Sequence, residues 1–535
     1  MDEKNQSAYG YDYATQVAPA EPGVPPTPVT ETPVANPPAP RFSIPTGKKE
    51  LIFGLFALLA GWLMFNSIFF GGGYQLGYAI FAAAGLLAVT AYLLASGCKP
   101  SAYSITLLVL DFVILGSFAR SNDGFVKFVM LCFLVVSINL GLCLTAGQNR
   151  FRPEKLSSLL DVFRVATRLS TGKLPAAITG LADSTKKGGS SMKRVGAVAL
   201  GACIALPLLC ILIPLLMRAD AAFEGLLDSL PQLNAAEIVV TFLFGIFFGF
   251  WLYLRGVGLK HSPKKAYTPA KERKGISAIT VNTALIAVCV VYVVYLVSQL
   301  AYFSGAFSGF LPEEYTLAEY ARRGFFEMAW ICAVNLLVIC LAAGVCRKKD
   351  GRTPLFTRLL CLFVGIVTLF LVASASSKMF MYIDGYGMTR LRLLTEVIMI
   401  FMGLTTLIIS VWLFVPKLPY MKAVLIVALV MGAAVAWADV DTVVAKYNVE
   451  AYQSGKLETV DMRYLGELGS GAVPYMYQLT EDSDPEVAEE AKDLLSYRFG
   501  EAGKIEDFRF WNYADMVADP YLPEPPQEEQ AVDIQ

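Results

Sequence analysis

Long runs of apolar residues, separated by short polar segments, cover this chain from about residue 50 to residue 438. Runs of about 18 apolar residues or more are long enough for a helix to cross a hydrocarbon core of ~30 Å. None shows the period of two of a half-buried strand, and open sheet edges are not tolerated in lipid, so the runs predict membrane-spanning helices. The eleven predicted spans are 50–70, 75–96, 102–119, 124–146, 195–217, 237–255, 277–303, 324–346, 354–377, 391–414 and 420–438.

The composition agrees with a membrane protein. Hydrophobic residues make up 55% of the 535 residues and charged residues 17%, whereas soluble domains have about 45–50% and about 25%. The predicted fold class is therefore all-α: a polytopic transmembrane helical bundle of about eleven spans, with a small extracytoplasmic helical C-terminal domain. The lipid bilayer is the expected partner, and a net charge of −1 gives no reason to expect nucleic acid.

Changes in composition along the chain predict six segments. They are a disordered, Pro-rich cytoplasmic tail (1–47), spans one to four (50–146), a basic amphipathic cytoplasmic loop (150–194), spans five to eleven (195–438), an acidic extracytoplasmic helical region (439–515) and a disordered tail (516–535). The N-terminal tail has too little apolar surface to fold. Met1–Arg41 also lacks the apolar core of a signal peptide, so the first span is expected to direct insertion.

The distribution of Lys and Arg predicts the orientation. Basic residues concentrate in every second connection between spans, most densely in 150–194, 255–274 and 347–358. Cytoplasmic loops of membrane proteins carry such an excess. The N-terminus is therefore expected in the cytoplasm and the C-terminus on the other side of the membrane.

The two long polar segments have helical patterns. In 150–194, apolar residues from Leu156 to Leu169 alternate with Arg164 and Arg168 at helical spacing, which indicates an amphipathic helix in contact with anionic lipid of the inner leaflet. An ordinary positive-inside loop is the alternative. In the acidic tail, Glu486–Phe499 follows Pro485 and predicts an amphipathic helix. With a second helix in 465–479 it resembles one hairpin of the HEAT type, and this tail could meet a protein partner.

Several kinds of chemistry are disfavoured. The only histidine, His261, lies in a basic loop, which argues against a His-based zinc site or a Ser–His–Asp triad. No phosphate-binding GxxxxGK[ST] motif is present. The ten cysteines lie in or beside apolar runs and form neither a disulfide framework nor a CxxC metal site. We therefore expect no metal and no cofactor, and a non-enzymatic role is favoured over an enzymatic one.

Asp111 lies in the middle of the third span, among apolar residues. Charged side chains inside spans are rare and are read by default as functional. Asp111 is therefore a candidate for proton or ion coupling. A hydrogen bond between helices, or a buried protonated acid, is the structural alternative.

A denser group of polar residues is predicted at the outer ends of spans seven, eight and ten. The candidate ligand-binding residues are Tyr295, Gln299, Tyr302, Tyr320, Arg322, Arg323, Glu327, Asp384, Arg390, Arg392 and Glu396. Arg323 and Glu327 are four residues apart, as are Arg392 and Glu396, so each pair shares a helix face. If the three spans adjoin, these residues surround an outward-facing cavity.

Asp384 is expected in a loop between spans nine and ten, with Gly385 and Gly387 in tight turns. Arginine forks suit an anionic group such as a phosphate or a carboxylate. Three structural alternatives stay open for the group as a whole. The tyrosines fit an interfacial aromatic belt, the arginines fit snorkelling to headgroups, and the ion pairs fit contacts that only hold helices together.

Three stretches of sequence resemble a known family. They are EYTLAEYARRGFFEMAWICAVNL (314–336), KMFMYIDGYGMTRLRLLTEVIM (378–399) and VAKYNVEAYQSGKLETVDMRYLGELGSGAVP (444–474). They are similar to a family of bacterial multi-pass membrane proteins described as domain of unknown function 4173, which is related to family 4153. FRFWNYADM (508–516) departs from the ending typical of that family. The resemblance implies a bacterial cell membrane and makes the outer group of residues a family signature, and it implies no activity, cofactor or substrate.

The leading functional hypothesis is transport or binding of an anionic or lipid-like ligand at an outward-facing site, with Asp111 as the coupling carboxylate. A membrane scaffold or sensor that uses the acidic tail is the second hypothesis. The third is a membrane-embedded enzyme that acts on a lipid-linked substrate, with Asp384, Glu327 or Glu396 as its base.

Overall fold

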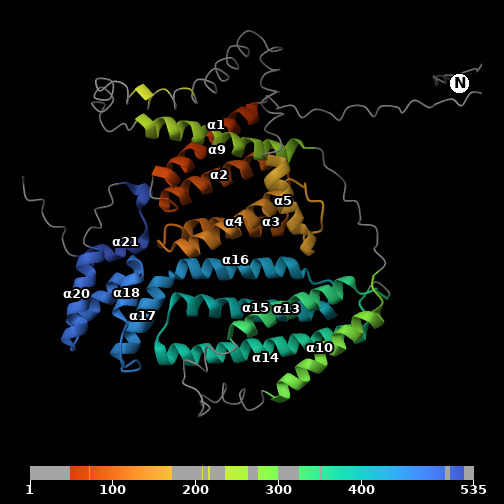
Figure 1. Ribbon diagram of the computed structural model, residues 1–535. Coiled ribbons are helices and arrows are strands. Elements are labelled where there is room, and N and C mark those ends of the chain that lie inside the picture. Colours follow the sequence, from red (N-terminus) through yellow and green to blue (C-terminus); the bar gives the residue numbers. More distant parts are fainter. Residues whose placement is uncertain are drawn as a thin grey trace, which may run out of the picture. The chain divides into compact units, whose positions relative to one another are not determined.

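The computed structural model describes residues 48–70, 73–170, 235–262, 275–298, 325–349, 352–499 and 507–522, besides single positions between 208 and 216. Within these ranges the regular elements are helices and no strand is formed (Figure 1). The N-terminal tail, the predicted fifth span and most of the basic loop lie outside the described residues. The predicted all-α class is confirmed.

Ten of the predicted spans coincide with described helices. The helices are α1 (Lys48–Phe70), α2 (Leu76–Ala95), α3 (Ala102–Ser117), α4 (Gly124–Thr145), α9 (Ala235–His261), α10 (Ala278–Ser298), α13 (Phe325–Val345), α14 (Leu355–Tyr386), α15 (Arg390–Phe414) and α16 (Tyr420–Ala438). Eight of these described helices, all except α3 and α9, have the length and hydropathy of a membrane span. The chain is thus a multi-pass membrane protein, and the number of eleven spans stays a prediction.

The first group of packed helices consists of α1, α2, α3, α4 and α9, which share one hydrophobic core. α1 and α9 cross at very close range because glycines meet at the crossing. A Cβ atom on Gly61 would overlap the backbone of Gly249, and one on Gly245 would overlap Trp62. Gly245 and Gly249 have the GxxxG spacing that lets helix backbones approach closely in membranes.

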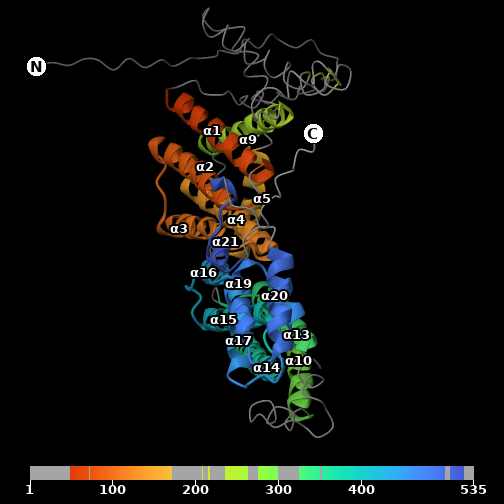
Figure 2. The same cartoon turned by 90° about the vertical axis from the view of Figure 1, so that its left-hand side faces the viewer.

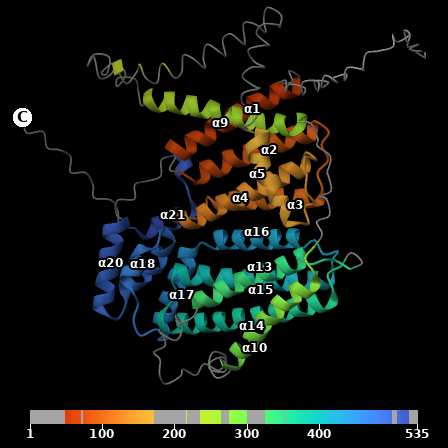
Figure 3. The same ribbon diagram turned by 45° about the vertical axis from the view of Figure 1, so that its right-hand side comes forward.

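The second group consists of α10, α13, α14 and α15, with cores around Leu371, Met399 and Ile339. α14 packs against all three other helices of the group. The sequence left open whether spans seven, eight and ten adjoin; in the structure these three helices pack mainly on α14, the ninth predicted span. α16 packs on α3 and α4 on one side and on α15 on the other, so it lies between the two groups (Figures 1 and 3).

α14 is longer than the sequence predicted. The expected loop around Asp384 is helical as far as Tyr386, and Gly387 ends the helix with a φ of 75°. The prediction of a tight turn at Gly385 was wrong, because helix propagation past the membrane costs little where the exposed turns are solvated. With 32 residues at ~1.5 Å each, α14 is longer than a ~30 Å hydrocarbon core.

The described part of the basic loop contains η1 (Leu156–Ser158), α5 (Leu159–Arg164) and η2 (Val165–Ser170). Its Asp161 is fully buried and accepts hydrogen bonds of 2.9 Å from the backbone of Arg150 and Phe151. This face packs onto α4, while Leu160 and Phe163 point outward and are 60% and 70% exposed. The described residues from Leu156 to Ser170 are thus helical, and the amphipathic helix in contact with anionic lipid stays a prediction.

The C-terminal region consists of short helices at one end of the bundle, and Figure 2 views the molecule from that end. They are α17 (Val440–Gln453), α18 (Met462–Glu467), η4 (Ser470–Ala472), α19 (Val473–Gln478), η5 (Leu479–Glu481), α20 (Pro485–Phe499), η6 (Phe508–Phe510), α21 (Tyr513–Ala518) and η7 (Asp519–Tyr521). α19 packs against α20, as expected for the predicted hairpin. The predicted disordered tail starts too early, because residues up to Tyr521 are helical and Ala518 is buried.

Candidate functional site

Asp439 connects the last span to the C-terminal region. It is the single residue between α16 and α17, it is 1% exposed, and its φ is +59°. Its Oδ2 accepts a hydrogen bond of 2.7 Å from the Thr442 hydroxyl, while its buried Oδ1 has no hydrogen bond among the described residues. Burial raises the pKa of this carboxyl above its usual value. A left-handed backbone at a residue with a side chain is strained by roughly 1–3 kcal/mol, and such strain collects at functional positions.

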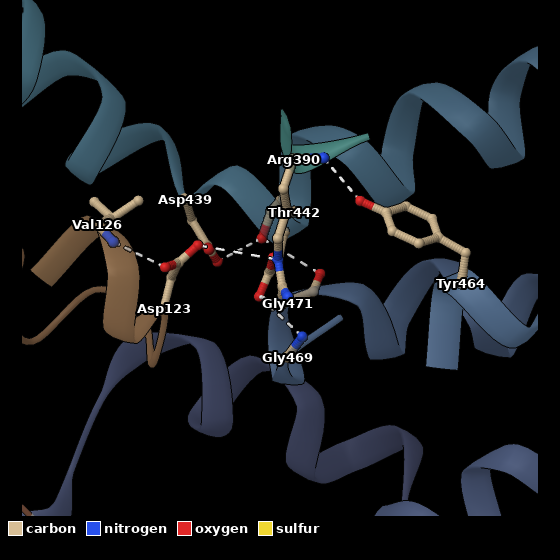
Figure 4. A network of polar contacts seen from close by, with 9 residues as sticks. Asp123, Val126, Arg390, Asp439, Thr442, Tyr464, Gly469 and Gly471 are labelled. Atoms are coloured by element: carbon tan, nitrogen blue, oxygen red, sulfur yellow. Dashed lines mark hydrogen bonds and ion pairs between the residues drawn. The ribbon is translucent and has the colours of Figure 1, made fainter. Parts of the chain in front are cut away.

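The first residue of α15, Arg390, binds the C-terminal region. Its guanidinium forms a two-point ion pair with Asp441 of α17, in which Nη2 donates to Oδ2 over 2.7 Å and Nε donates to Oδ1. Asp441 is 3% exposed and also accepts a 2.9 Å hydrogen bond from the Gly469 amide. The Arg390 amide donates to the Tyr464 hydroxyl over 2.7 Å. These contacts are drawn in Figure 4 and fix α17 and α18 against the start of α15.

Asp123 joins this network from the first group of helices. It caps the N-terminus of α4, because its Oδ1 accepts the Val126 amide over 2.9 Å. Its Oδ2 lies 4.0 Å from Nε of Arg390. Asp123, Arg390, Asp439 and Asp441 thus converge from α4, α15 and α17 on one polar region (Figure 4), which we call the junction.

A cavity of about 700 Å³, with both polar and apolar lining residues, opens at the junction. It is lined by residues of the loop before α4, of the start of α15 and of the C-terminal region: Asn122, Asp123, Gly124, Phe125, Arg390, Leu391, Leu394, Asp441, Glu467, Leu468, Gly469 and Ser470. Its lining combines carboxylates, one guanidinium and apolar side chains, which is the composition of a site for a molecule with both polar and apolar parts.

An apolar groove of about 180 Å³ runs between α4, α15 and α16. Its lining residues are Phe125, Val126, Val129, Met130, Phe133, Leu394, Val397, Ile398, Phe401, Ala428, Met431, Gly432 and Val435. Phe125 and Leu394 line both the cavity and the groove. The two spaces are therefore neighbours, one polar at the helix ends and one apolar between the spans.

α21 holds the cavity rim in place. The amides of Tyr513 and Ala514 donate to the carbonyls of Ala119 and Arg120 over 2.8 and 3.1 Å. Asp515 accepts hydrogen bonds from Asn122 and from the Ser470 hydroxyl, at 3.2 and 2.5 Å. Because Asn122 and Ser470 both line the cavity, α21 ties the bundle side of the rim to the C-terminal side.

Of the predicted ligand-binding residues, Arg390 lines the cavity. Arg392 and Asp384 do not line it and instead make contacts between helices. Arg392 donates to the backbone carbonyls of Tyr386 and Gly387 and stacks over the Tyr382 ring at 4.0 Å, so it caps the end of α14. Asp384 accepts hydrogen bonds of 2.7 Å from Lys456 and 3.0 Å from the Tyr447 hydroxyl. These contacts attach α14 to the C-terminal region.

The remaining described candidates are dispersed. Glu396 is 6% exposed, and its Oε2 has no hydrogen bond among the described residues; no ion pair joins it to Arg392 in that part of the chain. Tyr295 packs in the core of the second group, and Glu327 is exposed in the first turn of α13. Gln299, Tyr302, Tyr320, Arg322 and Arg323 lie outside the described residues.

Asp111 lies on α3 in the first group of helices, and α3 contributes no residue to the junction. It is fully buried, and neither carboxyl oxygen has a hydrogen-bond partner among the described residues. Its polar neighbour is the Ser137 hydroxyl of α4. Asn139 of α4 accepts a 2.6 Å hydrogen bond from the buried Arg255 of α9.

Sequence reasoning missed Asn122, Asp123, Asp441, Glu467 and Ser470. Asp123 carried a local signal, since an Asp followed by Gly and an apolar run is typical of a helix start. Asp441 follows the last span directly, but nothing local indicates its pairing with Arg390, 51 residues earlier in the chain. The cavity is a product of long-range packing.

A comparison with family models gives one match. A model described as domain of unknown function (DUF4153) matches residues 81–479. The label 4173 suggested by the sequence resemblance is not confirmed, whereas its relative 4153 is. Comparisons with curated proteins and with solved structures find no match.

Proposed function

From the premise that this chain belongs to the DUF4153 family of unknown function, we propose that it binds and transports a lipid-like ligand at the junction. The observation that carries the proposal is the shared lining of the polar cavity and the apolar groove by Phe125 and Leu394. The cavity of about 700 Å³ has room for a polar head group, and the groove between α4, α15 and α16 has room for the first part of a hydrocarbon chain.

The exposure of the groove residues supports entry from the membrane. Phe125 is 64% exposed and Ile398 is 54% exposed, although both lie on helices with the hydropathy of spans. Burial of each CH₂ group of a lipid chain contributes about 0.8 kcal/mol relative to water. Within a bilayer this gain vanishes, so the polar cavity must supply most of the selectivity.

We place the junction on the extracytoplasmic side, following the distribution of Lys and Arg. Reporter fusion at residue 535 tests this placement. A fusion that is active only in the periplasm supports it. One that is active only in the cytoplasm contradicts it, and then either the orientation is reversed or the number of spans is even.

A direct test fills the groove. Ile398→Trp places a large ring at a lining position that needs no repacking because the side chain is already half exposed. Ile400→Trp is the matched control, since Ile400 lies on the same helix, is 46% exposed and does not line the groove. Purified full-length variants are exposed to mixed phospholipids, stripped by detergent, and the retained lipid is measured by native mass spectrometry.

The expected result is retention of lipid by the wild type and by Ile400→Trp, with a loss of tenfold or more in Ile398→Trp, on the order of the affinity lost when a packed pocket is blocked. Equal retention by all three proteins contradicts the proposal. Gel filtration of each variant confirms that the fold is intact before retention is compared.

Asp111 is proposed as the coupling group of this transport. An unpaired carboxylate inside a bundle is costly unless it is neutral, and the complete burial of Asp111 beside Ser137 gives it a reason to exchange a proton when the helices move. Its separation from the junction means that coupling requires a movement of α3 against α4.

The ties between spans and C-terminal region favour a second candidate function, a sensor. The region is attached to α15 by Arg390, to α14 by Asp384 and to the loop before α4 by Asp515. A partner that binds and moves the C-terminal helices would therefore displace α14, α15 and the loop before α4. Lys456→Ala breaks the contact with α14 without changing the cavity lining, so it tests the sensor separately from the lipid site. Faster hydrogen exchange along α14 supports the sensor, and exchange that is unchanged beyond the last turn of α14 contradicts it.

A further inference from the structure

We propose that the head group bound in the cavity is a cationic amine, so that the ligand is an amine-bearing lipid of the leaflet that faces the junction. This inference rests on the proposed function and adds the chemistry of the head group to it. It differs from the anionic ligand that the arginines suggested in the sequence.

The charge of the cavity lining is the first observation. Three carboxylates line it, those of Asp123, Asp441 and Glu467, and Arg390 is the only cation in the lining. Arg390 directs two of its five guanidinium donors to Asp441 in a two-point ion pair, so the positive charge of Arg390 is already balanced by one of the three acids. Glu467 is exposed at the rim, and Asp123 keeps Oδ2 4.0 Å from the nearest guanidinium nitrogen. The lining therefore attracts a positive charge.

The second observation is an acceptor that lacks a donor. Oδ1 of Asp439 is buried and has no hydrogen bond among the described residues, although the residue is only 1% exposed. Figure 4 shows the Asp439 carboxylate turned toward that of Asp123. A buried polar atom without a partner costs about 1–3 kcal/mol. Asp439 does not itself line the cavity; it adds an acid behind the lining, within electrostatic range of Lys127 and Arg120.

The arrangement of the acids favours an amine over a metal ion. Within the described ranges, no three acidic, His or Cys side chains have the spacing to hold a metal. An ammonium group has no fixed coordination geometry and donates separate N–H bonds, so it suits carboxylates that come from α4, α17 and α18 and are also engaged with protein amides.

The apolar groove beside the cavity favours a lipid as the source of the amine. Phe125 and Leu394 place the groove directly beside the acids. A phospholipid with a primary amine can put its head group in the cavity while one chain lies in the groove. A small soluble amine would contact only the acids of the cavity, and the groove would contribute nothing to its affinity.

The test compares three lipids that share their acyl chains and differ in head group. Full-length protein is incubated with equal amounts of phosphatidylethanolamine, phosphatidylcholine and phosphatidylglycerol, and the retained lipids are measured by native mass spectrometry. The variant Asp123→Asn/Glu467→Gln removes two charges, and Asn still caps α4. Glu450→Gln is the matched control, because Glu450 is an exposed acid of α17 outside the cavity lining.

We expect the wild type and Glu450→Gln to retain phosphatidylethanolamine about tenfold over phosphatidylglycerol, with phosphatidylcholine between them because its quaternary nitrogen cannot donate. The double variant should lose most of this preference. No preference in the wild type, or an unchanged preference in the double variant, overturns the inference.

The outcomes for the inference and for the proposed function are distinguishable. Lipid retention that is lost in Ile398→Trp but shows no head-group preference refutes the amine and keeps the lipid site. Retention that is unaffected by Ile398→Trp refutes the site itself. If phosphoethanolamine without acyl chains competes as well as the lipid at equal concentration, the amine is correct and the lipid source is wrong.

Discussion

The ion pair between Arg390 and Asp441 makes a sharp prediction about how the C-terminal region is held. Replacement of Arg390 by Ala leaves the Asp441 carboxylate, which is 3% exposed, with the Gly469 amide as its described hydrogen-bond donor. Breaking a buried pair from one side costs about 3–5 kcal/mol. The Arg390 side chain is 36% exposed, so water solvates part of the site and we expect roughly half of that cost, about 2 kcal/mol.

Hydrogen exchange of the backbone amides measures this cost locally. A loss of about 2 kcal/mol corresponds to about thirtyfold more frequent opening. We expect exchange in α17 and α18 of the full-length Arg390→Ala protein to rise by that factor, for example at the Val443 amide, which donates to Asp439 over 3.0 Å. Amides in the middle of α4 should not change, because the bundle core does not include the pair.

Arg392→Ala is the matched control, since Arg392 is the same residue type two positions further along α15 and contacts carbonyls of α14 instead of an acid. It should leave α17 protected. Adding Asp441→Asn to Arg390→Ala removes the unpaired charge and should restore about half of the protection. The reasoning is refuted if both arginine variants raise exchange in α17 equally, or if Arg390→Ala raises it nowhere.

Three further predictions concern single residues. Gly471→Ala should destabilise the C-terminal region by about 1–3 kcal/mol, because a Cβ atom would collide with Thr442 and Asp439; Gly344→Ala, which meets nothing within 4 Å, should be neutral or stabilising in the same thermal assay. Burial raises the pKa of Asp439, so the native state binds this proton more tightly than the unfolded chain does, and stability should fall as pH rises from about 4 to the raised value. Asp439→Asn should make the melting temperature less dependent on pH between pH 4 and 8. If the melting temperature of this variant changes with pH as it does in the wild type, other groups cause the pH dependence. Asp111→Asn should keep the fold and abolish the pH dependence of lipid transport in vesicles, whereas transport that keeps its pH dependence would remove Asp111 from the coupling.

The positions of the helices were predictable because they depend on local composition. An apolar run in lipid must satisfy its backbone groups internally, which leaves a helix as the outcome whatever its neighbours are. For this reason the predicted span 420–438 and the helix Tyr420–Ala438 coincide. The extension of α14 to Tyr386 was not predictable from hydropathy, because the polar stretch Ser376–Lys378 interrupts the apolar run and because Lys456 and Tyr447 of the C-terminal region hold the end of the helix at Asp384.

The candidate site was predicted only in part. Arg390 was expected at a binding site and does line the cavity, but its expected companions Arg392 and Asp384 serve as contacts between α14 and its neighbours. The sequence placed all three at the same end of the bundle, which was correct. It gave no information about which helix each side chain faces, since helix rotation depends on packing against partners far away in the chain.

By itself, the sequence determined that this is a helical multi-pass membrane protein with an acidic C-terminal region, because the cost of polar groups in lipid acts on each segment separately. Only the tertiary structure decided where the polar residues meet. It packed α10, α13 and α15 around α14, an arrangement that the sequence left open, and it brought Asp123, Arg390 and Asp441 together from three elements. The physical reason is that a charge in or near a membrane must find a partner, and many pairings satisfy that need until the packing of the whole bundle selects one.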